Sequence, residues 1–211
     1  VQDITVGIDE HDYQGADVRR MPIRAGLIKV AGGLDHLDAH ERKIFRAAAL
    51  AHRMTGAPIM THTEQGTAAL EQLEVLVAAG AELRHVVLSH TDRRPDLRYH
   101  EEILRSGAYV EFDSSFRWGA EEGNPTRDLV CRLVERGFGA QLLLGMDAAR
   151  RRYWRAYGGG PGLRFLLLEF VPQLRQAGLG DGDLHRIFVT NPAAAYQVDA
   201  RAAAADGGVP C

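Results

Sequence analysis

The sequence predicts an α/β protein with a parallel sheet, either a doubly wound sheet or a TIM barrel. Short apolar runs alternate with helix-like stretches about every 25 to 35 residues, the length of a βα unit. Each run is continuously apolar, as in strands that are covered on both faces. No Gly-x-Gly-x-x-Gly follows a strand, which argues against a dinucleotide fold. Ligand-type residues end several runs, where TIM barrels build their active sites, and this favours the barrel.

The expected elements follow from apolar spacing and from helix signals. Asp38 and Glu41 form a capping-box pattern at the start of one helix, and Gly56 ends it. The expected strands are residues 25–31, 58–62, 86–89, 109–112 and 142–144. The expected helices are residues 38–55, 67–79, 96–106, 125–136, 163–176 and 183–188, with a short helical piece ending at residue 196.

Composition limits the class of protein. The chain has 211 residues, 45% of them hydrophobic, and a formal charge of -3, so a nucleic-acid-binding surface is not expected. The two cysteines, Cys131 and Cys211, suggest no disulfide framework, and a cytoplasmic location is expected. No run is long enough to cross a membrane. Residues 1–199 are expected to form one portion of a barrel, and residues 200–211, which are mostly Ala, Gly and Asp, a disordered tail.

Four residues stand where chemistry is expected. His62, His90 and Asp147 each follow an apolar strand, and such groups bind metals or accept a proton from bound water. Lys29 lies inside an apolar strand, where an ammonium is costly. A lowered pKa would favour its neutral amine, which can form a Schiff base or react with carbon dioxide to give an anionic carbamate.

Other polar residues have less specific interpretations. Asp113 also ends a strand, as a catalytic or a supporting group. Glu64 and Asp92 are substrate contacts or solvated loop residues, and Arg93 and Arg94 are expected in solvent. The segment 150–153 lines a substrate pocket or anchors a loop. The remaining candidates are histidines expected on the surface: His36, His40, His52, His85, His100 and His185.

Six segments resemble consecutive blocks of the phosphotriesterase family, in the amidohydrolase superfamily, over residues from about 4 to 196. They are Ala25-Gly-Leu-Ile-Lys-Val30, Pro58-Ile-Met-Thr-His-Thr63, Leu88-Ser-His-Thr-Asp92, Tyr109-Val-Glu-Phe-Asp113, Leu144-Gly-Met-Asp147 and Val189-Thr-Asn-Pro192. The resemblance implies strands four to eight of a (β/α)8 barrel, and a hydrolase with two divalent metals, usually zinc.

The resemblance also implies the role of each site residue. Lys29 matches the carboxylated lysine that bridges the two metals. His62 and His90 match ligands of the more exposed metal. Asp147 matches the ligand of the buried metal, and it also accepts the proton of the bridging hydroxide. The implied substrate is a small ester, lactone or amide, and a homodimer is an expected assembly.

Three departures from the family pattern matter. The sequence contains no His-x-His pair, which the family carries on its first strand, and by alignment of the blocks the first three strands are absent. Ser114 stands where phosphotriesterases and lactonases have His or Arg. Arg93 stands three residues after His90, the histidine that matches the sixth strand of the barrel, where they usually have Asp. Organophosphate hydrolysis is therefore not expected.

Three hypotheses follow from these residues. The first is a metal-dependent hydrolase in which Asp147 accepts a proton. The second is a truncated, non-catalytic barrel remnant with a partial metal site. The third, an aldolase-type Schiff base on Lys29, leaves His62 and His90 without a joint role. Because an open barrel exposes strand edges, the isolated chain is expected to be poorly soluble or oligomeric, and to bind at most one metal well.

Overall fold

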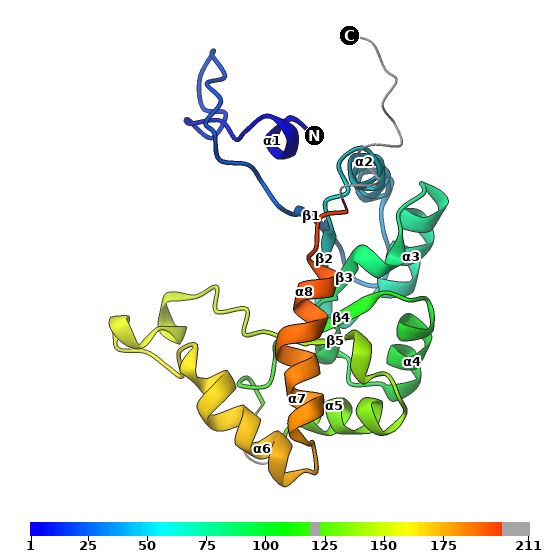
Figure 1. Cartoon of the computed structure of the whole chain (residues 1–211), viewed down its shortest axis with the longest axis vertical. Coiled ribbons are helices and arrows are strands. Elements are labelled where there is room, and N and C mark those ends of the chain that lie inside the picture. The colour runs from blue at the N-terminus through cyan, green and yellow to red at the C-terminus, as the bar shows by residue number, and fades with distance from the viewer. Residues whose placement is uncertain (119–122, 200–211) are drawn as a thin grey trace.

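Five parallel strands form one sheet in the order of the sequence, as expected for a partial barrel (Figure 1). The computed structural model describes residues 1–118 and 123–199. The strands are β1 (Ile28–Gly32), β2 (Ile59–Thr63), β3 (Val86–Ser89), β4 (Tyr109–Phe112) and β5 (Leu142–Leu144). All five expected strands are therefore confirmed, with shifts of a few residues at their ends.

Helices follow the strands in turn and cover the outer face of the sheet (Figure 1). The helices that follow β1 to β4 are α2 (Ala39–Thr55), α3 (Ala69–Ala78), α4 (Leu97–Arg105) and α5 (Pro125–Glu135). Later in the chain come a π-helical turn (Leu166–Phe170) with α6 (Val171–Gln176), and α7 (Asp181–His185), a second π-helical turn (Arg186–Thr190) and α8 (Asn191–Ala195). A short helix, α1 (Gln2–Thr5), lies near the N-terminus.

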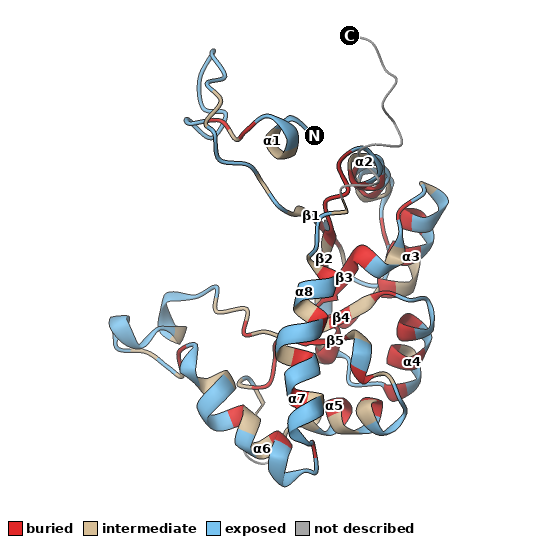
Figure 2. Ribbon diagram, in the orientation of Figure 1, coloured by how far each residue is buried: buried red, intermediate tan, exposed pale blue. Residues whose placement is uncertain are grey.

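Most of the core lies between the sheet and this helical layer, where buried residues gather (Figure 2). The largest fully buried side chains include Phe45, Leu88 and Phe112. A second, smaller cluster lies on the inner face of the sheet. There Val87, Leu143 and Ala195 of α8 are buried together, and Tyr109 and Tyr196 pack against them.

The signals at the ends of α2 act as the sequence predicts. Asp38 accepts a hydrogen bond from the Glu41 backbone N–H (2.8 Å), and the Glu41 carboxylate accepts one from the Asp38 N–H (2.9 Å). Gly56 ends the helix with a φ of 67°, a left-handed conformation that glycine adopts without strain. This capping box therefore fixes where the first covering helix begins.

The last helix is longer than the sequence suggests. Helical backbone runs without a break from Asp181 to Ala195, although we expected a helix ending at residue 188 and a separate short helical piece ending at residue 196. The reason lies in Asn191, whose side-chain amide donates to the carbonyls of Gly139 (2.8 Å) and Leu142 (2.7 Å). These bonds tie the helix to the amino end of β5, and tertiary contact keeps the segment helical.

Three histidines expected on the surface are buried instead. His52, His85 and His100 have exposed fractions of 2%, 4% and 0%. The His52 ring lies 2.7 Å from the carbonyl of Ala57, and the His100 ring lies 2.7 Å from the carbonyl of its own helix at Asp96. Local bonds of this kind reduce the cost of burying His52 and His100, and helical spacing alone does not reveal them. The ring nitrogens of His85 have no hydrogen-bond partner among the described residues.

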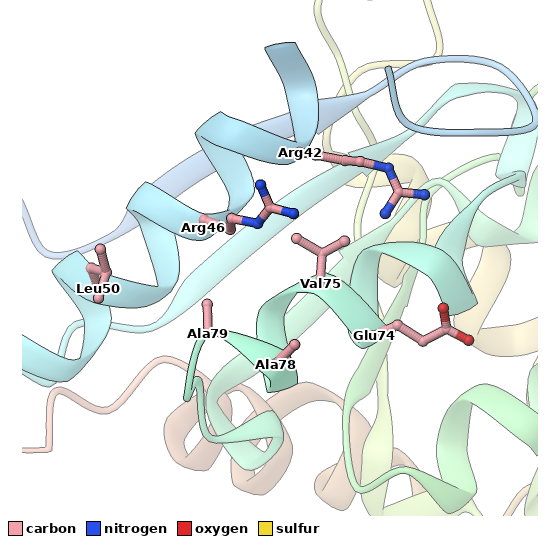
Figure 3. A pocket seen from close by; sticks show the side chains of 7 residues that line it. All are labelled: Arg42, Arg46, Leu50, Glu74, Val75, Ala78 and Ala79. Atoms are coloured by element: carbon pink, nitrogen blue, oxygen red, sulfur yellow. The ribbon is translucent and has the colours of Figure 1, made fainter. Parts of the chain in front are cut away.

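Other parts of the chain lie away from the strand ends. Residues 1–24 form a mostly exposed arm beside the sheet (Figures 1 and 2). A cavity of about 430 Å³ opens between α2 and α3, on the outer layer (Figure 3). Its lining residues are Arg42, Arg46, Leu50, Glu74, Val75, Ala78 and Ala79.

Among the described residues, no helix is long and apolar enough to cross a membrane. The expected tail, 200–211, lies outside the described residues.

Candidate metal centre

Three side chains from neighbouring strand ends meet at the carboxyl end of the sheet. His90 follows β3, Asp113 follows β4 and Asp147 lies beyond β5. One ligand atom from each lies within 4.8 Å of the others. Parallel strands bring their carboxyl ends to one edge, so residues distant in sequence become neighbours here. One imidazole and two carboxylates form a donor set suited to a divalent cation such as zinc.

Asp113 orients His90. The ring Nδ1 of His90 lies 2.5 Å from Asp113 Oδ2, and both side chains are buried. With Nδ1 donating to the carboxylate, Nε2 keeps its lone pair for a ligand, as in the carboxylate–histidine pairs of zinc sites. The other oxygen of Asp113, Oδ1, is buried without a hydrogen-bond partner. A buried anionic oxygen without a partner fits a site that a cation completes.

Two of these residues hold the backbone in a left-handed conformation. The φ angle is 68° at His90 and 39° at Asp147, and neither residue is glycine. Such conformations cost about 1–3 kcal/mol and persist where surrounding contacts fix them, often at functional sites. The strain therefore coincides with the cluster of candidate ligands.

His62 lies beside His90 but outside this group of three. The ring centroids of His62 and His90 are 4.7 Å apart, edge to face. The Nε2 of His62 lies 3.0 Å from Glu64 Oε2, and this hydrogen bond lowers the pKa of Glu64. Glu64 is thus a hydrogen-bond partner of His62, whereas the sequence suggested a substrate contact or a solvated loop residue.

Lys29 is exposed, whereas the sequence suggested that its strand would bury it. Among the described residues β1 pairs only with β2, so it is an edge strand, and Lys29 stands on its open inner face. The surrounding sheet still removes enough water to lower the pKa of Lys29. The negative charges of Glu111, Asp147 and Asp113 act in the opposite direction. A lowered pKa favours the neutral amine that carbamate formation requires.

Glu111 is a site residue that the sequence reasoning missed. It lies on the inner face of β4, in the same cross-strand row as His62, with Ser89 between them. Burial, and then the charge of Asp113, raises its pKa to about 7. Gly145 leaves room for it, since a Cβ there would lie 2.0 Å from Glu111 Oε1. An acid within an apolar strand is the same signal that drew attention to Lys29.

Asp92 is buried and joins two loops, so it is neither a solvated residue nor an open substrate contact. Its Oδ2 accepts hydrogen bonds from the Ser114 N–H (2.8 Å) and the Thr126 hydroxyl (2.7 Å). Burial, and then the charge of Asp113, raises the pKa of Asp92 to about 6. These bonds connect the loop after β3 to the residue after Asp113 and to the start of α5, and so support His90 and Asp113.

Arg93 is not in solvent as expected, because it binds Asp147. Its Nη2 lies 3.1 Å from Asp147 Oδ2. Arg117, from the loop after β4, reaches the same oxygen at 2.7 Å and the Asp147 carbonyl at 2.9 Å. The two loops in which Arg93 and Ser114 depart from the family pattern thus each supply an arginine to Asp147.

A cavity of about 530 Å³ opens beside these arginines. It is lined by Phe116, Arg117, Arg150, Arg152, Tyr153, Gly160 and Pro161. The hydrogen bond from Arg152, with the charges of Arg117 and Arg150, lowers the pKa of Tyr153. The segment 150–153 therefore lines a cavity with an excess of positive charge.

A second group of possible ligands lies at the opposite end of β3. Glu82, His85 and Asp199 also place one ligand atom each within 4.8 Å of one another. Arg84 already bridges the two carboxylates there, at 2.5 Å from Glu82 Oε2 and 2.8 Å from Asp199 Oδ2. The Arg84 guanidinium thus ties the two carboxylates together, and the group fastens the chain at residue 199.

The chain is similar to known proteins over most of its length. A model of the phosphotriesterase family matches residues 1–196. The phospho-furanose lactonase of Mycoplasmopsis synoviae is 33% identical over 198 residues, which cover 91% of this chain and 56% of the lactonase. The phosphotriesterase homology protein of Escherichia coli is 35% identical, over 93% of this chain and 67% of that protein.

A solved structure agrees with these sequence comparisons. The crystal structure of an amidohydrolase from Mycoplasma synoviae superposes with a TM-score of 0.89 at 32% identity, over 94% of this chain and 58% of that one. The chain thus spans a little over half of that barrel, which is consistent with five parallel strands. From the family match, the sequence identity and the shared architecture, the chain belongs to the phosphotriesterase family.

Proposed function

We propose that this chain carries the metal centre of a hydrolase that cleaves an ester, lactone or amide bond in a small molecule. The observation that carries the proposal is the convergence of His90, Asp113 and Asp147 at the carboxyl end of the sheet. The unpartnered Asp113 oxygen and the left-handed backbone of two of these residues support it.

In this proposal one zinc ion is held by His90 and Asp147, with His62 and a carbamate on Lys29 as further ligands. The family resemblance distributes these residues over two metals, with Lys29 bridging them. A bound divalent cation lowers the pKa of water toward neutrality and polarises the bond to be cleaved. Asp113 holds the His90 ring, and Asp147 accepts the proton that leaves the attacking water. Because the sequence has no His-x-His pair, the second metal position lacks two of its usual ligands.

The substrate we favour is a lactone that bears an anionic group. The cavity beside Asp147 is lined by three arginines. Arg117 is bound to Asp147, and the guanidinium groups of Arg150 and Arg152 suit phosphate or carboxylate oxygens. The name of the related phospho-furanose lactonase describes a substrate of this kind. Arg150 and Arg152 would bind the anionic end while the carbonyl lies toward Asp147.

The test uses the whole chain, purified with zinc and bicarbonate. Metal content is measured by elemental analysis, and hydrolysis is followed with lactones, aryl esters and N-acyl amides, with and without a phosphate group. We expect about one metal per chain and faster cleavage of the phosphorylated lactone. A His90→Gln variant should lose both, while His36→Gln, in an exposed loop, should lose neither. A chain with less than one metal equivalent and no hydrolysis would support the alternative, a non-catalytic barrel remnant.

A further inference from the structure

Two arginines from different loops converge on one oxygen of Asp147. Arg93 follows β3 and Arg117 follows β4, and each donates to Oδ2, at 3.1 Å and 2.7 Å. The other carboxylate oxygen, Oδ1, receives no hydrogen bond from the described residues. Two guanidinium groups carry more positive charge than one carboxylate needs for neutrality. Because both of them contact Oδ2, Oδ1 is the oxygen left free to face a ligand.

Arg117 also holds the main chain of Asp147. The same nitrogen that binds Oδ2 donates to the Asp147 carbonyl at 2.9 Å. The φ angle of 39° at Asp147 lies in the left-handed region, which a non-glycine residue adopts only when other contacts fix it. One guanidinium thus ties the side chain and the backbone of Asp147 together.

Arg117 is itself held in place by aromatic rings. Its guanidinium carbon lies 5.0 Å from the centre of the Phe116 ring and 5.4 Å from that of Tyr153. These two rings meet edge to face, with centroids 5.0 Å apart. The Arg117 N–H donates to the Ser114 carbonyl at 2.8 Å, which closes a turn directly after β4. A planar guanidinium stacked on aromatic faces is pre-organised in a way that a lysine is not.

We propose that Arg117, assisted by Arg93, is a positioning residue that fixes the carboxylate of Asp147 so that Oδ1 faces the metal and the attacking water. This inference rests on the proposed function. Two loop arginines thus support Asp147. In this chain Ser114 and Arg93 stand at the two positions where the family usually has other groups. Arg117 makes two contacts with Asp147 and Arg93 makes one, so Arg117 has the larger share.

The first test needs no metal. Hydrogen–deuterium exchange of the full chain is compared for Arg117→Ala and for Arg98→Ala, an exposed arginine on α4 that serves as the matched control. We expect peptides covering residues 145–150 to exchange faster in Arg117→Ala and at the original rate in Arg98→Ala. An unchanged rate in Arg117→Ala would overturn the inference, whatever the chain's activity.

The second test uses Co²⁺ as the probe, followed by its visible absorption. We expect Arg117→Ala to weaken Co²⁺ binding about 10- to 100-fold and to change the spectrum, as loss of a partner of a metal ligand does. Arg93→Ala should have a smaller effect, and Arg98→Ala none. Arg117→Lys keeps the charge but loses the planar fork, so it should remain impaired. Full recovery in Arg117→Lys would show that charge alone matters and would overturn the positioning role.

The two tests separate this inference from the proposed function. If the unaltered chain binds no Co²⁺, the proposed function fails, while the exchange experiment still decides whether Arg117 holds Asp147. If the chain binds Co²⁺ and Arg117→Ala binds it equally well with the same spectrum, the proposed function stands and the inference is wrong. Where hydrolysis is measurable, Arg117→Ala should lower kcat with little change in KM.

Discussion

The carboxyl and amino ends of this sheet treat polar groups differently. At the carboxyl end, Asp92, Asp113 and Glu111 each keep one buried oxygen without a hydrogen-bond partner. Elsewhere on the inner face, Val87 and Leu143 pack against α8, and the carboxylates at the amino-end margin are paired with Arg84. Unpaired buried oxygens cost stability, which is consistent with the binding that we propose for the carboxyl end.

His85 qualifies this contrast, because it lies at the amino end with both ring nitrogens buried and without hydrogen-bond partners. Its ring lies 5.9 Å from the ring of His52, and its Nε2 lies 3.9 Å from Asp199. His85 is therefore a titratable group at the amino end, and its protonation should change stability and not metal binding. The following experiments test the contrast, from the largest expected effect to the smallest.

The largest expected effect is a loss of metal affinity after a substitution at the carboxyl end. Replacing Asp147 with Asn removes the charge that we propose as metal ligand and proton acceptor, and metal affinity should fall by about 100-fold or more, since even outer partners of ligands are worth 10- to 100-fold. Hydrolysis, where measurable, should fall with it. Isothermal titration with Zn²⁺ gives the affinity, and circular dichroism checks the fold. Unchanged affinity in the variant would exclude Asp147 from the centre.

The apolar cluster on the inner face should respond in stability. Leu143→Ala removes a side chain that is 3% exposed on the inner face, which should cost about 2–5 kcal/mol of unfolding free energy. Leu163→Ala, at a position 57% exposed, should change stability by less than about 0.5 kcal/mol. Urea unfolding measures both. If Leu143→Ala costs as little as Leu163→Ala, the inner face is not packed as described.

Buried histidines predict a loss of stability in acid. Burial lowers the pKa of His85 and of His100 below the ordinary value of 6.5. At these two positions the unfolded chain then binds more protons than the folded chain below that pH, so their contribution to stability is complete above about pH 6.5 and is lost as the pH drops. The raised pKa values of Glu111 and Asp92 contribute with the opposite sign. His85→Leu and His100→Leu should each flatten this decline, measured by urea unfolding across pH. The exposed His40→Leu is the control, and a double variant that keeps the original slope would refute the assignment.

The smallest effect should come from the capping box of α2. Asp38→Ala removes the side-chain acceptor for the Glu41 N–H and should cost about 1 kcal/mol. The helix begins after β1 on the outer layer, so metal affinity should not change. Lys43→Ala, at an exposed position within α2, serves as a comparison, since its side chain has no role in the cap. A loss of metal binding in Asp38→Ala would show that the outer layer and the centre are coupled.

Local signals were sufficient for most of the fold. Continuous apolar runs located the five strands, and Asp38, Glu41 and Gly56 marked the ends of α2, because caps and turns act over a few residues. The family resemblance supplied the barrel type and the order of its strands. The helix from Asp181 to Ala195 was predicted too short, because the contacts that sustain it come from Asn191 to β5.

The site was predicted less completely. His90 and Asp147 follow strands, and the convergence of strand ends brings them together, as expected. The prediction that Lys29 is buried was wrong, because the exposure of its side chain depends on which strands flank β1. Arg93 was placed in solvent because its partner, Asp147, lies 54 residues later in the chain. No local pattern reports a contact of that kind.

The sequence by itself determined the α/β class, the positions of the strands and the residue types at their carboxyl ends, since these depend on periodicity and on short-range turn chemistry. Only the tertiary structure decided which of those residues meet. It brought Asp113 to His90, and it brought arginines from two loops to a single oxygen of Asp147. The physical reason is that a parallel sheet fixes neighbours through its register and through burial, and both arise between segments that are far apart in the chain.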